Sequence, residues 1–270
     1  MKSKVFLSVE NISSRYGNVE ILHDISFTVN EHSITALLGA NGSGKTTLIK
    51  CLCSLQKHEG RCILQNEALE KYSIKQRAKK ISYIPQKSGI QMSISVIDVV
   101  LMGYNAVLSL LEKPSLKQVQ KAQVVLADLG LKDFANRDFM SLSEGEKQLV
   151  ILARTIIEEA TLLLLDEADS ALDFKNRRIF LNEVCKLVKA EEKAAVLTLH
   201  DPLLALQYCD QLILLKEGRC VGCIYPQKDT METIEKALSK IYGNIKLKEI
   251  KGKEGKRLFA MFMEDEVCVQ

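Results

Sequence analysis

The chain has 270 residues, of which 47% are hydrophobic and 26% charged, a composition typical of a globular protein with a sizeable core. Its net charge of +3 does not favour nucleic acid as a partner, and no apolar run reaches the roughly 18 residues of a membrane-spanning helix. Ser8, Glu10 and Asn11 interrupt the apolar start, so it lacks a signal-peptide core and we expect a cytosolic protein.

Alternation and short apolar runs predict several strands in the first part of the chain. These strands are expected at residues 25–29, 34–38, 62–64 and 81–84. The second of them leads directly into a glycine-rich stretch and then into a helical-looking segment, LIKCLCSL at residues 48–55. From about Val96 to Ile157 the apolar spacing becomes helical, which predicts an all-helical insertion.

Strands and helices alternate again after this insertion. Buried strands are predicted at residues 162–165, 194–199 and 211–215, with helices at residues 175–190 and 201–209. The tail from about Thr230 predicts one helix and then two weak strands around Ile245 and Phe259. The alternation predicts an α/β domain with a mostly parallel, covered sheet. We expect this domain over residues 1–229, with its helical subdomain at about 87–157, and a short C-terminal extension over residues 230–270.

The eight cysteines are expected to be reduced thiols in the cytosol. Cys220 and Cys223 form a single C-x-x-C pattern, which is weak evidence for zinc without a second pair or nearby histidines. We therefore expect core or incidental thiols, since free cysteine is among the most buried residue types.

Residues 39–46, GANGSGKT, match the phosphate-loop pattern G-x-x-x-x-G-K-[ST] between a predicted strand and a predicted helix. Glycines let the backbone point its N–H groups at phosphate oxygens, Lys45 reaches the terminal phosphates and the Thr46 hydroxyl binds Mg²⁺. A chance glycine-rich turn would not explain the full pattern with both flanks. The expected nucleotide ligands are Gly39, Ala40, Asn41, Gly42, Ser43, Gly44, Lys45, Thr46 and Thr47.

Two carboxylates, Asp166 and Glu167, end the apolar strand at residues 162–165. A carboxylate is costly to bury without a partner, so a pair here favours a site for Mg²⁺ and for the attacking water. Asp166 would hold the ion, directly or through water, and Glu167 would act as the base. The alternative is that the pair only caps the following helix. His200 ends the next strand and is expected at the same sheet edge, where it could contact the γ-phosphate.

The start of the helix at SLSEGEKQLVILAR, residues 141–154, supports two interpretations. Ser143 and Glu146 have the spacing of a capping box, which explains the start as local structure. A helix N-terminus is also a binding site for an anion such as phosphate. The two interpretations are compatible if Ser143 caps the helix in one state and binds phosphate in another.

With these elements in order, the sequence resembles the ATP-binding cassette (ABC) ATPases over most of its length. The matching motifs are Walker A at residues 39–46, the Q-loop residue Gln86, the signature LSEGE at residues 142–146, Walker B at residues 162–167, the D-loop SALD at residues 170–173 and the switch histidine His200. Six motifs in this order are far more specific than any one of them.

The resemblance implies the P-loop NTPase fold of the ABC type, with a mostly parallel sheet core, antiparallel N-terminal strands and a helical subdomain. It also implies an ATPase that uses ATP and Mg²⁺ and works as a homodimer. Tyr16 would stack on adenine, and Glu167 and His200 would align the attacking water. Thr46, Gln86 and Asp166 would organise Mg²⁺. The signature helix of one subunit would meet ATP held by Walker A of the other. The residues expected to contact ATP across this interface are Ser143, Gly145, Glu146 and Asp173.

Three positions depart from the usual pattern of the family. Glu144 replaces the first signature glycine, so a carboxylate stands near a polyanion and should weaken closure unless it points away. Glu146 replaces the usual glutamine. Ala168 and Asp169 stand where Pro-Thr is usual, which predicts a less rigid turn. None of these changes removes a group that the chemistry needs, and we expect an active ATPase.

Residues 96–105 (VIDVVLMGYN) and 215–220 (LKEGRC) are similar to the branch that powers import of iron–siderophore, haem, cobalamin and related metal chelates. That resemblance implies two integral-membrane permease subunits, an indirect extracytoplasmic binding protein and a peripheral location on the inner face of the membrane. A helical lobe at about residues 86–140 would receive a short helix from each permease, although VIDVVLM would equally suit a buried core helix. Zinc or manganese importer ATPases, and ABC ATPases of the iron–sulphur assembly type, remain alternatives.

Overall fold

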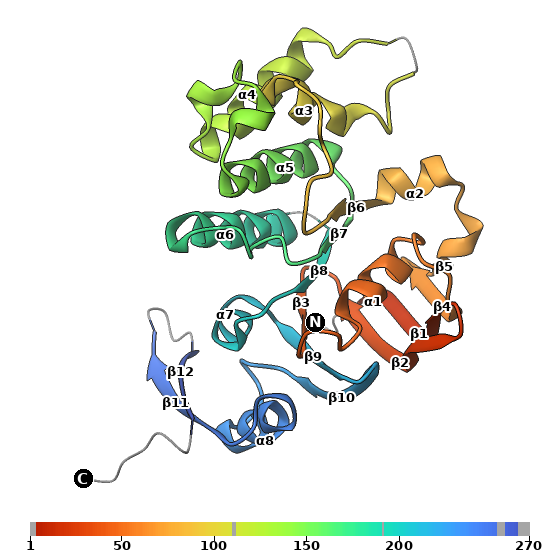
Figure 1. The fold of residues 1–270 in the computed structure, drawn as a ribbon, viewed down its shortest axis with the longest axis vertical. Coiled ribbons are helices and arrows are strands. Elements are labelled where there is room, and N and C mark those ends of the chain that lie inside the picture. Colours follow the sequence, from red (N-terminus) through yellow and green to blue (C-terminus); the bar gives the residue numbers. More distant parts are fainter. Residues whose placement is uncertain (1–3, 110–111, 191, 253–256, 264–270) are drawn as a thin grey trace. The chain divides into compact units, whose positions relative to one another are not determined.

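The structure is a computed structural model that describes residues 4–109, 112–190, 192–252 and 257–263. It has two compact units, one of residues 1–69 and 194–270 and the other of residues 70–193 (Figure 1). Among the described residues, no helix has the length and apolar character that crossing a membrane requires.

The first unit holds the glycine-rich loop, two sheets and the C-terminal extension. Its N-terminal elements are β1 (Val5–Tyr16), β2 (Val19–Asn30), β3 (Ile34–Leu38), α1 (Lys45–Leu52), β4 (Glu59–Leu64) and β5 (Glu67–Ala68). Its C-terminal elements are β8 (Ala194–Thr198), α7 (Pro202–Tyr208), β9 (Gln211–Lys216), β10 (Arg219–Ile224), α8 (Met231–Tyr242), β11 (Ile245–Lys251) and β12 (Arg257–Met263). These elements include every strand predicted for this unit.

Pairing in the first unit confirms the predicted combination of parallel and antiparallel strands. β1 pairs antiparallel with β2 and β4, and β5 extends β4. β3 is fully buried and pairs parallel with β8 and β9, while β10 lies antiparallel to β9. In β2, buried Ile25, Phe27 and Val29 alternate with exposed Ser26 and Thr28, because successive side chains of a strand point to opposite faces.

The second unit is mainly helical and begins at residue 70, within the short turn η1 (Leu69–Lys71). Its elements are α2 (Ile74–Lys80), β6 (Ile81–Ile84), α3 (Val96–Leu101), η2 (Met102–Tyr104), α4 (Leu116–Asp128), η3 (Lys132–Phe134), η4 (Phe139–Ser141), α5 (Glu144–Glu158), β7 (Leu162–Leu165) and α6 (Phe174–Ala190). β6 and β7 pair in parallel, and α5 packs against α3, α4 and α6. Buried side chains such as Leu149 and Leu152 of α5 each contribute roughly 1.5–3 kcal/mol to this core.

Two helices differ from the sequence prediction. α1 ends at Leu52 rather than continuing to residue 55, because Ser54 adopts a left-handed conformation (φ 57°) and turns the chain. α2 was not expected, since it buries no side chain and so shows no apolar stripe. A capping box between Ser73 and Gln76 stabilises its start instead.

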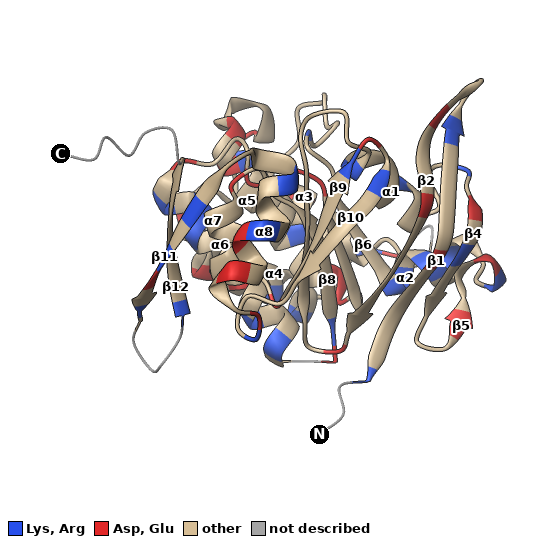
Figure 2. Cartoon of the chain, turned by 90° about the horizontal axis from the view of Figure 1, so that it is seen from below, with Lys and Arg blue, Asp and Glu red and all other residues tan. Residues whose placement is uncertain are grey.

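Charged residues are distributed over the surface elements without a dominant sign. Figure 2 shows Lys and Arg interspersed with Asp and Glu on the elements that it displays, in keeping with the net charge of +3.

Candidate functional site

The glycine-rich loop connects β3 to α1 within the first unit. Gly42 and Gly44 have φ values of 79° and 100°, in the region where a side chain would be strained. A Cβ atom at Gly44 would also lie 2.6 Å from Cδ2 of Leu22. The buried Lys45 ammonium donates hydrogen bonds to the carbonyl oxygens of Gly39 (2.8 Å) and Ala40 (3.1 Å). The loop therefore curls around its own lysine.

The start of α1 suits an anion, because no side chain caps it and its first turn carries no acidic residue. Ser43 adds a buried hydroxyl oxygen that has no hydrogen-bond partner among the described residues. A buried polar group without a partner is unfavourable, and a phosphate oxygen would accept its hydrogen. The residues present thus fit the triphosphate that the motif predicts.

The turn between β9 and β10 contacts the backbone of this loop. The Gly218 N–H donates to the carbonyl oxygen of Ser43 at 3.2 Å, and a Cβ atom at Gly39 would collide with the carbonyl oxygen of Leu215. The sequence motif did not predict this support, because residues 215–218 lie far from the loop in the chain.

Two further predicted residues, Tyr16 and His200, lie in the same unit. Tyr16 ends β1 and is 48% exposed, so its ring is available for stacking. His200 follows β8, and its side chain is exposed. Asp201, the next residue, is the N-cap of α7 and accepts hydrogen bonds from the N–H groups of Leu203 (2.8 Å) and Leu204 (3.4 Å). The position of His200 is therefore tied to the start of α7.

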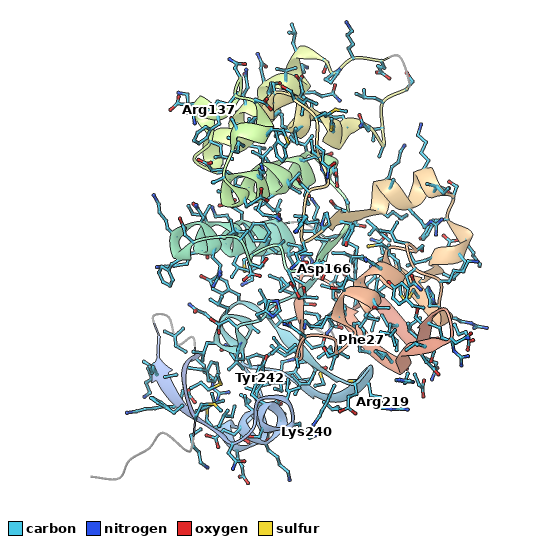
Figure 3. The ribbon with its side chains drawn as sticks, viewed as in Figure 1. Phe27, Arg137, Asp166, Arg219, Lys240 and Tyr242 are labelled. Carbon is cyan, nitrogen blue, oxygen red and sulfur yellow. The ribbon has the colours of Figure 1, made fainter. Side chains whose placement is uncertain are left out.

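In the second unit, Asp166 and Glu167 follow the buried strand β7 as predicted. The Asp166 N–H donates to the carbonyl oxygen of Ile84 on β6 at 2.8 Å, and the residue is only 3% exposed (Figure 3). Glu167 has a positive φ of 47°, which places it at a turn as soon as the strand ends. Such a conformation costs a non-glycine residue on the order of 1–3 kcal/mol, a strain found often at functional sites.

Gln86 and Glu167 meet, although they lie far apart in the sequence. The Gln86 side chain donates from Nε2 to Oε2 of Glu167 at 2.7 Å, which orients this carboxylate. Gln148 of α5 in turn donates from Nε2 to the backbone carbonyl of Gln86 at 2.8 Å. Gln148 is buried, and the sequence analysis did not predict its role. The one available sign was a glutamine among the apolar positions of a helix.

The start of α5 confirms the predicted capping box. The Ser143 hydroxyl accepts from the Glu146 N–H (3.3 Å) and donates to Oε2 of Glu146 (2.7 Å), which also accepts from the Ser143 N–H (2.8 Å). These bonds to the Ser143 hydroxyl and N–H, with a smaller contribution from Arg137, lower the pKa of Glu146 below its ordinary value. Glu144 forms an ion pair with Lys147 at 2.8 Å, so its carboxylate is partly neutralised by its own helix.

The D-loop packs against this helix start. A Cβ atom at Gly145 would lie 3.3 Å from the carbonyl oxygen of Ala171, so the two segments approach closely. The exposed Asp173 accepts a hydrogen bond from the Asn176 N–H at 2.7 Å and so caps the start of α6. The signature and the D-loop thus form one surface within the second unit.

Comparison with known proteins identifies the family. The sequence pattern described as ABC transporter matches residues 22–170. The chain belongs to the ABC transporter family. An iron chelatin transport ATP-binding protein of Helicobacter pylori is 38% identical over 79% of this chain and 84% of its own length. A hemin import ATP-binding protein of Pseudomonas fluorescens is 36% identical over 82% of this chain and 88% of its own length.

A solved structure extends the likeness to nearly the whole chain. It is described as an inward-facing, metal-chelate type ABC transporter and is 28% identical, with a TM-score of 0.79 over 97% of this chain and 99% of that chain. As members of the ABC transporter family are ATPases, this chain binds and hydrolyses ATP. The match includes the C-terminal extension, which lies outside the family pattern.

The structure also explains one departure from the usual ABC sequence. Asp169, where threonine is usual, is buried and lies 3.4 Å from the Arg177 guanidinium. Arg177 Nε also donates to the Asp169 carbonyl oxygen at 3.4 Å. An ion pair with α6 therefore stabilises the turn after Walker B in this chain. In family members with the usual Pro-Thr, the proline would restrict this turn instead.

Some of the cysteines are core residues. Cys51, Cys62 and Cys209 are buried, whereas Cys220 and Cys223 are exposed on β10. Cys268 lies outside the described residues. The described part of the chain contains no cluster of three or more His, Cys, Asp or Glu side chains suited to a metal ion.

Proposed function

We propose that this chain is the ATP-hydrolysing subunit of an importer for a metal chelate such as an iron–siderophore complex, haem or cobalamin. The observation that carries this assignment is the likeness over 97% of the chain to a metal-chelate type transporter. Relatives named for iron chelatin, hemin and petrobactin import support it. These names favour an importer over an assembly factor or a zinc or manganese importer.

In the proposed site, Tyr16 stacks on adenine and the loop at residues 39–47 holds the phosphates. Lys45 exchanges its contacts with the Gly39 and Ala40 carbonyls for the terminal phosphate oxygens. Thr46, Gln86 and Asp166 would hold Mg²⁺, which neutralises phosphate charge when bound. The hydroxyl, amide and carboxylate oxygens of these three residues are the donors that this hard cation prefers.

Glu167 is the proposed general base. Its hydrogen bond from Gln86 orients the carboxylate, which would accept a proton from the attacking water. His200, carried by the start of α7, would contact the γ-phosphate and align that water for in-line attack. Removal of the γ-phosphate would then remove the contacts that favour the ATP-bound state.

The signature helix is proposed to act on ATP bound by a second copy of the chain. Ser143, the Gly145 N–H, Glu146 and Asp173 would contact the other subunit's nucleotide. For this the Ser143 hydroxyl must stop donating to Glu146 and donate to the γ-phosphate instead. The N-terminal dipole of α5 would add roughly 0.3–1 kcal/mol of attraction for an anion at its exposed end.

A groove in the second unit is proposed to receive a permease helix at the cytoplasmic face of the membrane. It has a volume of about 1100 Å³ and lies between α2, α3 and the segment after η2. Its apolar lining includes Ile74, Leu101 and Met102, with Asp98 and Glu158 at polar positions. A short amphipathic helix fits a groove of this character. ATP-driven closure of the homodimer would thereby move the two permease subunits.

The first test uses Glu167→Gln, which removes the proposed base and keeps the hydrogen-bonding shape. We expect phosphate release to fall by roughly 10²- to 10⁴-fold, and an ATP-dependent dimer to accumulate, measured by light scattering with ATP and Mg²⁺. Glu192→Gln, an exposed carboxylate outside the site, is the control. Undiminished hydrolysis by Glu167→Gln would refute the assignment of the base.

A further inference from the structure

Strand β10 of the first unit carries a β-bulge that changes which of its side chains share a face. Cys220 pairs with Leu215 of β9. Cys223, three residues further on, pairs with Ile213, because the register shifts between residues 220 and 222. Leu215 and Ile213 are two positions apart on β9, so their side chains point to the same face. Directly opposed residues of an antiparallel pair also share a face, and the two cysteines therefore do so as well.

The bulge is held in place by the C-terminal helix. Residues three apart on a regular strand point to opposite faces, so the two thiols share a face only because the register passes over Val221. The Val221 carbonyl oxygen accepts a hydrogen bond from the Lys240 ammonium at 2.7 Å, and α8 packs beside β10 (Figure 1). Bulges often redirect side chains at functional sites. Here the result is a pair of exposed thiols, Cys220 and Cys223, on one face of a strand.

A buried amide donates a hydrogen bond to one of the two sulfur atoms. Gln211 of β9 is only 5% exposed, and its Nε2 donates to Sγ of Cys223 at 3.4 Å. The orientation of this amide is fixed, because its Oε1 accepts a hydrogen bond from the Thr35 hydroxyl at 3.2 Å. Nε2 also donates to the Tyr225 hydroxyl at 3.3 Å. An N–H donor at a sulfur atom favours the thiolate, which is the form that binds metal ions.

We propose that Cys220 and Cys223 bind a soft metal ion, Cu(I), between their two thiolates. Cu(I) prefers thiolate ligands and is satisfied by two of them, whereas a zinc ion would require two further ligands. Each thiol releases its proton to water when it binds the ion, and no electron is transferred. One Cu(I) with two thiolates has a net charge of −1, which suits a site whose bulge is bonded to the Lys240 ammonium. This site is separate from the proposed ATPase chemistry.

The spacing of the cysteines favours an ion between the sulfur atoms over a disulfide bond. Neighbouring positions on one face of a strand are roughly 6.4–6.8 Å apart, since each residue advances the strand by about 3.3 Å. This separation is at the upper end of the range of about 4.4–6.8 Å between the Cα atoms of a disulfide. A bridging ion adds two metal–sulfur bonds, each about 2.3 Å for zinc, and so joins sulfur atoms that are too far apart to bond directly.

The test titrates the reduced full chain with Cu(I), without oxygen and in competition with a chromogenic Cu(I) chelator. We expect the wild type to retain one Cu(I) per chain, with two sulfur neighbours in its X-ray absorption spectrum and weaker binding at lower pH, where protons compete for the thiolates. Cys220→Ser and Cys223→Ser should each lose the ion to the chelator. Cys185→Ser, which removes a half-buried cysteine of α6, is the matched control and should retain it.

A second variant tests the buried amide. Gln211→Met keeps a side chain of similar length but removes the donor to Cys223, and should weaken Cu(I) binding by roughly 10- to 100-fold. Because both cysteines are exposed, serine at either position should leave the melting temperature unchanged, so a lost ion reports a lost ligand. Failure of the wild type to retain Cu(I), or equal retention by Cys223→Ser, would overturn the proposal. Unchanged affinity in Gln211→Met would overturn the role given to the amide.

Discussion

The starts of α1 and α5 are both helix N-termini proposed to bind phosphate, but different parts of the chain build them. At α1 the backbone forms the site, because Gly42 and Gly44 have left-handed conformations and no side chain caps the helix. At α5 side chains form the helix start, through the reciprocal hydrogen bonds of Ser143 and Glu146. One start is left open for an anion, and the other is closed by its own carboxylate.

This difference explains where the sequence can vary. A backbone-built site depends on glycines and on the lysine that follows them, so its motif is matched at every position. The start of α5 depends on side chains, so the helix forms as long as the capping residues Ser143 and Glu146 are kept. It therefore accommodates Glu144, whose charge Lys147 offsets at 2.8 Å. The departures from the ABC pattern accordingly lie at α5 and beyond Walker B.

The largest effect is expected at the open start. Lys45→Ala should reduce hydrolysis by roughly 10²- to 10³-fold, because it removes the only side chain expected to place a positive charge on the terminal phosphates. Binding of a fluorescent ATP analogue should weaken in parallel. Lys50→Ala, in the last turn of the same helix, is the control for charge and helix propensity. Wild-type analogue binding by Lys45→Ala would mean that backbone N–H groups alone hold the nucleotide.

A smaller effect is expected from the carboxylate that closes α5, and it depends on pH. Because the pKa of Glu146 is lowered in the folded protein, its charge adds stability at pH values above the ordinary 4.5. That stability is lost as the pH falls through the lowered pKa. Glu146→Gln should be less stable than wild type by roughly 0.3–1 kcal/mol at neutral pH, with the difference vanishing in acid.

Urea unfolding at several pH values measures this difference. Glu232→Gln, in the first turn of α8, provides a matched carboxylate at a helix start without a reciprocal serine. If the free energy of unfolding of Glu146→Gln stays below that of wild type in acid, the cap depends on side-chain shape rather than on charge.

The smallest effect on stability is expected at Glu144. Its side chain is 65% exposed, and ion pairs of this kind contribute about 0–1 kcal/mol. Glu144→Gln should leave the melting temperature almost unchanged but strengthen ATP-dependent dimerisation in the Glu167→Gln background, since one negative charge near the polyanion is removed. Light scattering at low and high salt tests this, because screening should abolish the gain. Weaker dimerisation at low salt would show that the Glu144–Lys147 pair favours closure.

The sequence predicted those features that are encoded locally. The strand before Gly39, the capping box of Ser143 and the carboxylates at the end of β7 each follow from a few adjacent residues, and the structure contains all three. Local patterns also predicted α8 and the two strands after it. Contact between distant segments could not be predicted in this way.

Two contacts between distant segments shape the proposed site. Gln148 bonds to Gln86 across 62 positions, and Gly218 supports Ser43 from another part of the chain. Each depends on tertiary packing, which a single sequence does not encode in any short window.

The hydrogen bond from Gln148 to the backbone at Gln86 has a mechanical consequence. Gln86 touches the proposed base, and Gln148 belongs to the helix that begins at Ser143, so one buried side chain joins the hydrolytic carboxylate to the surface offered to a second subunit. The loop and the helix then share their movements rather than moving separately. A displacement of α5 by a neighbouring molecule would reach Glu167 through two hydrogen bonds, without any change in the nucleotide itself.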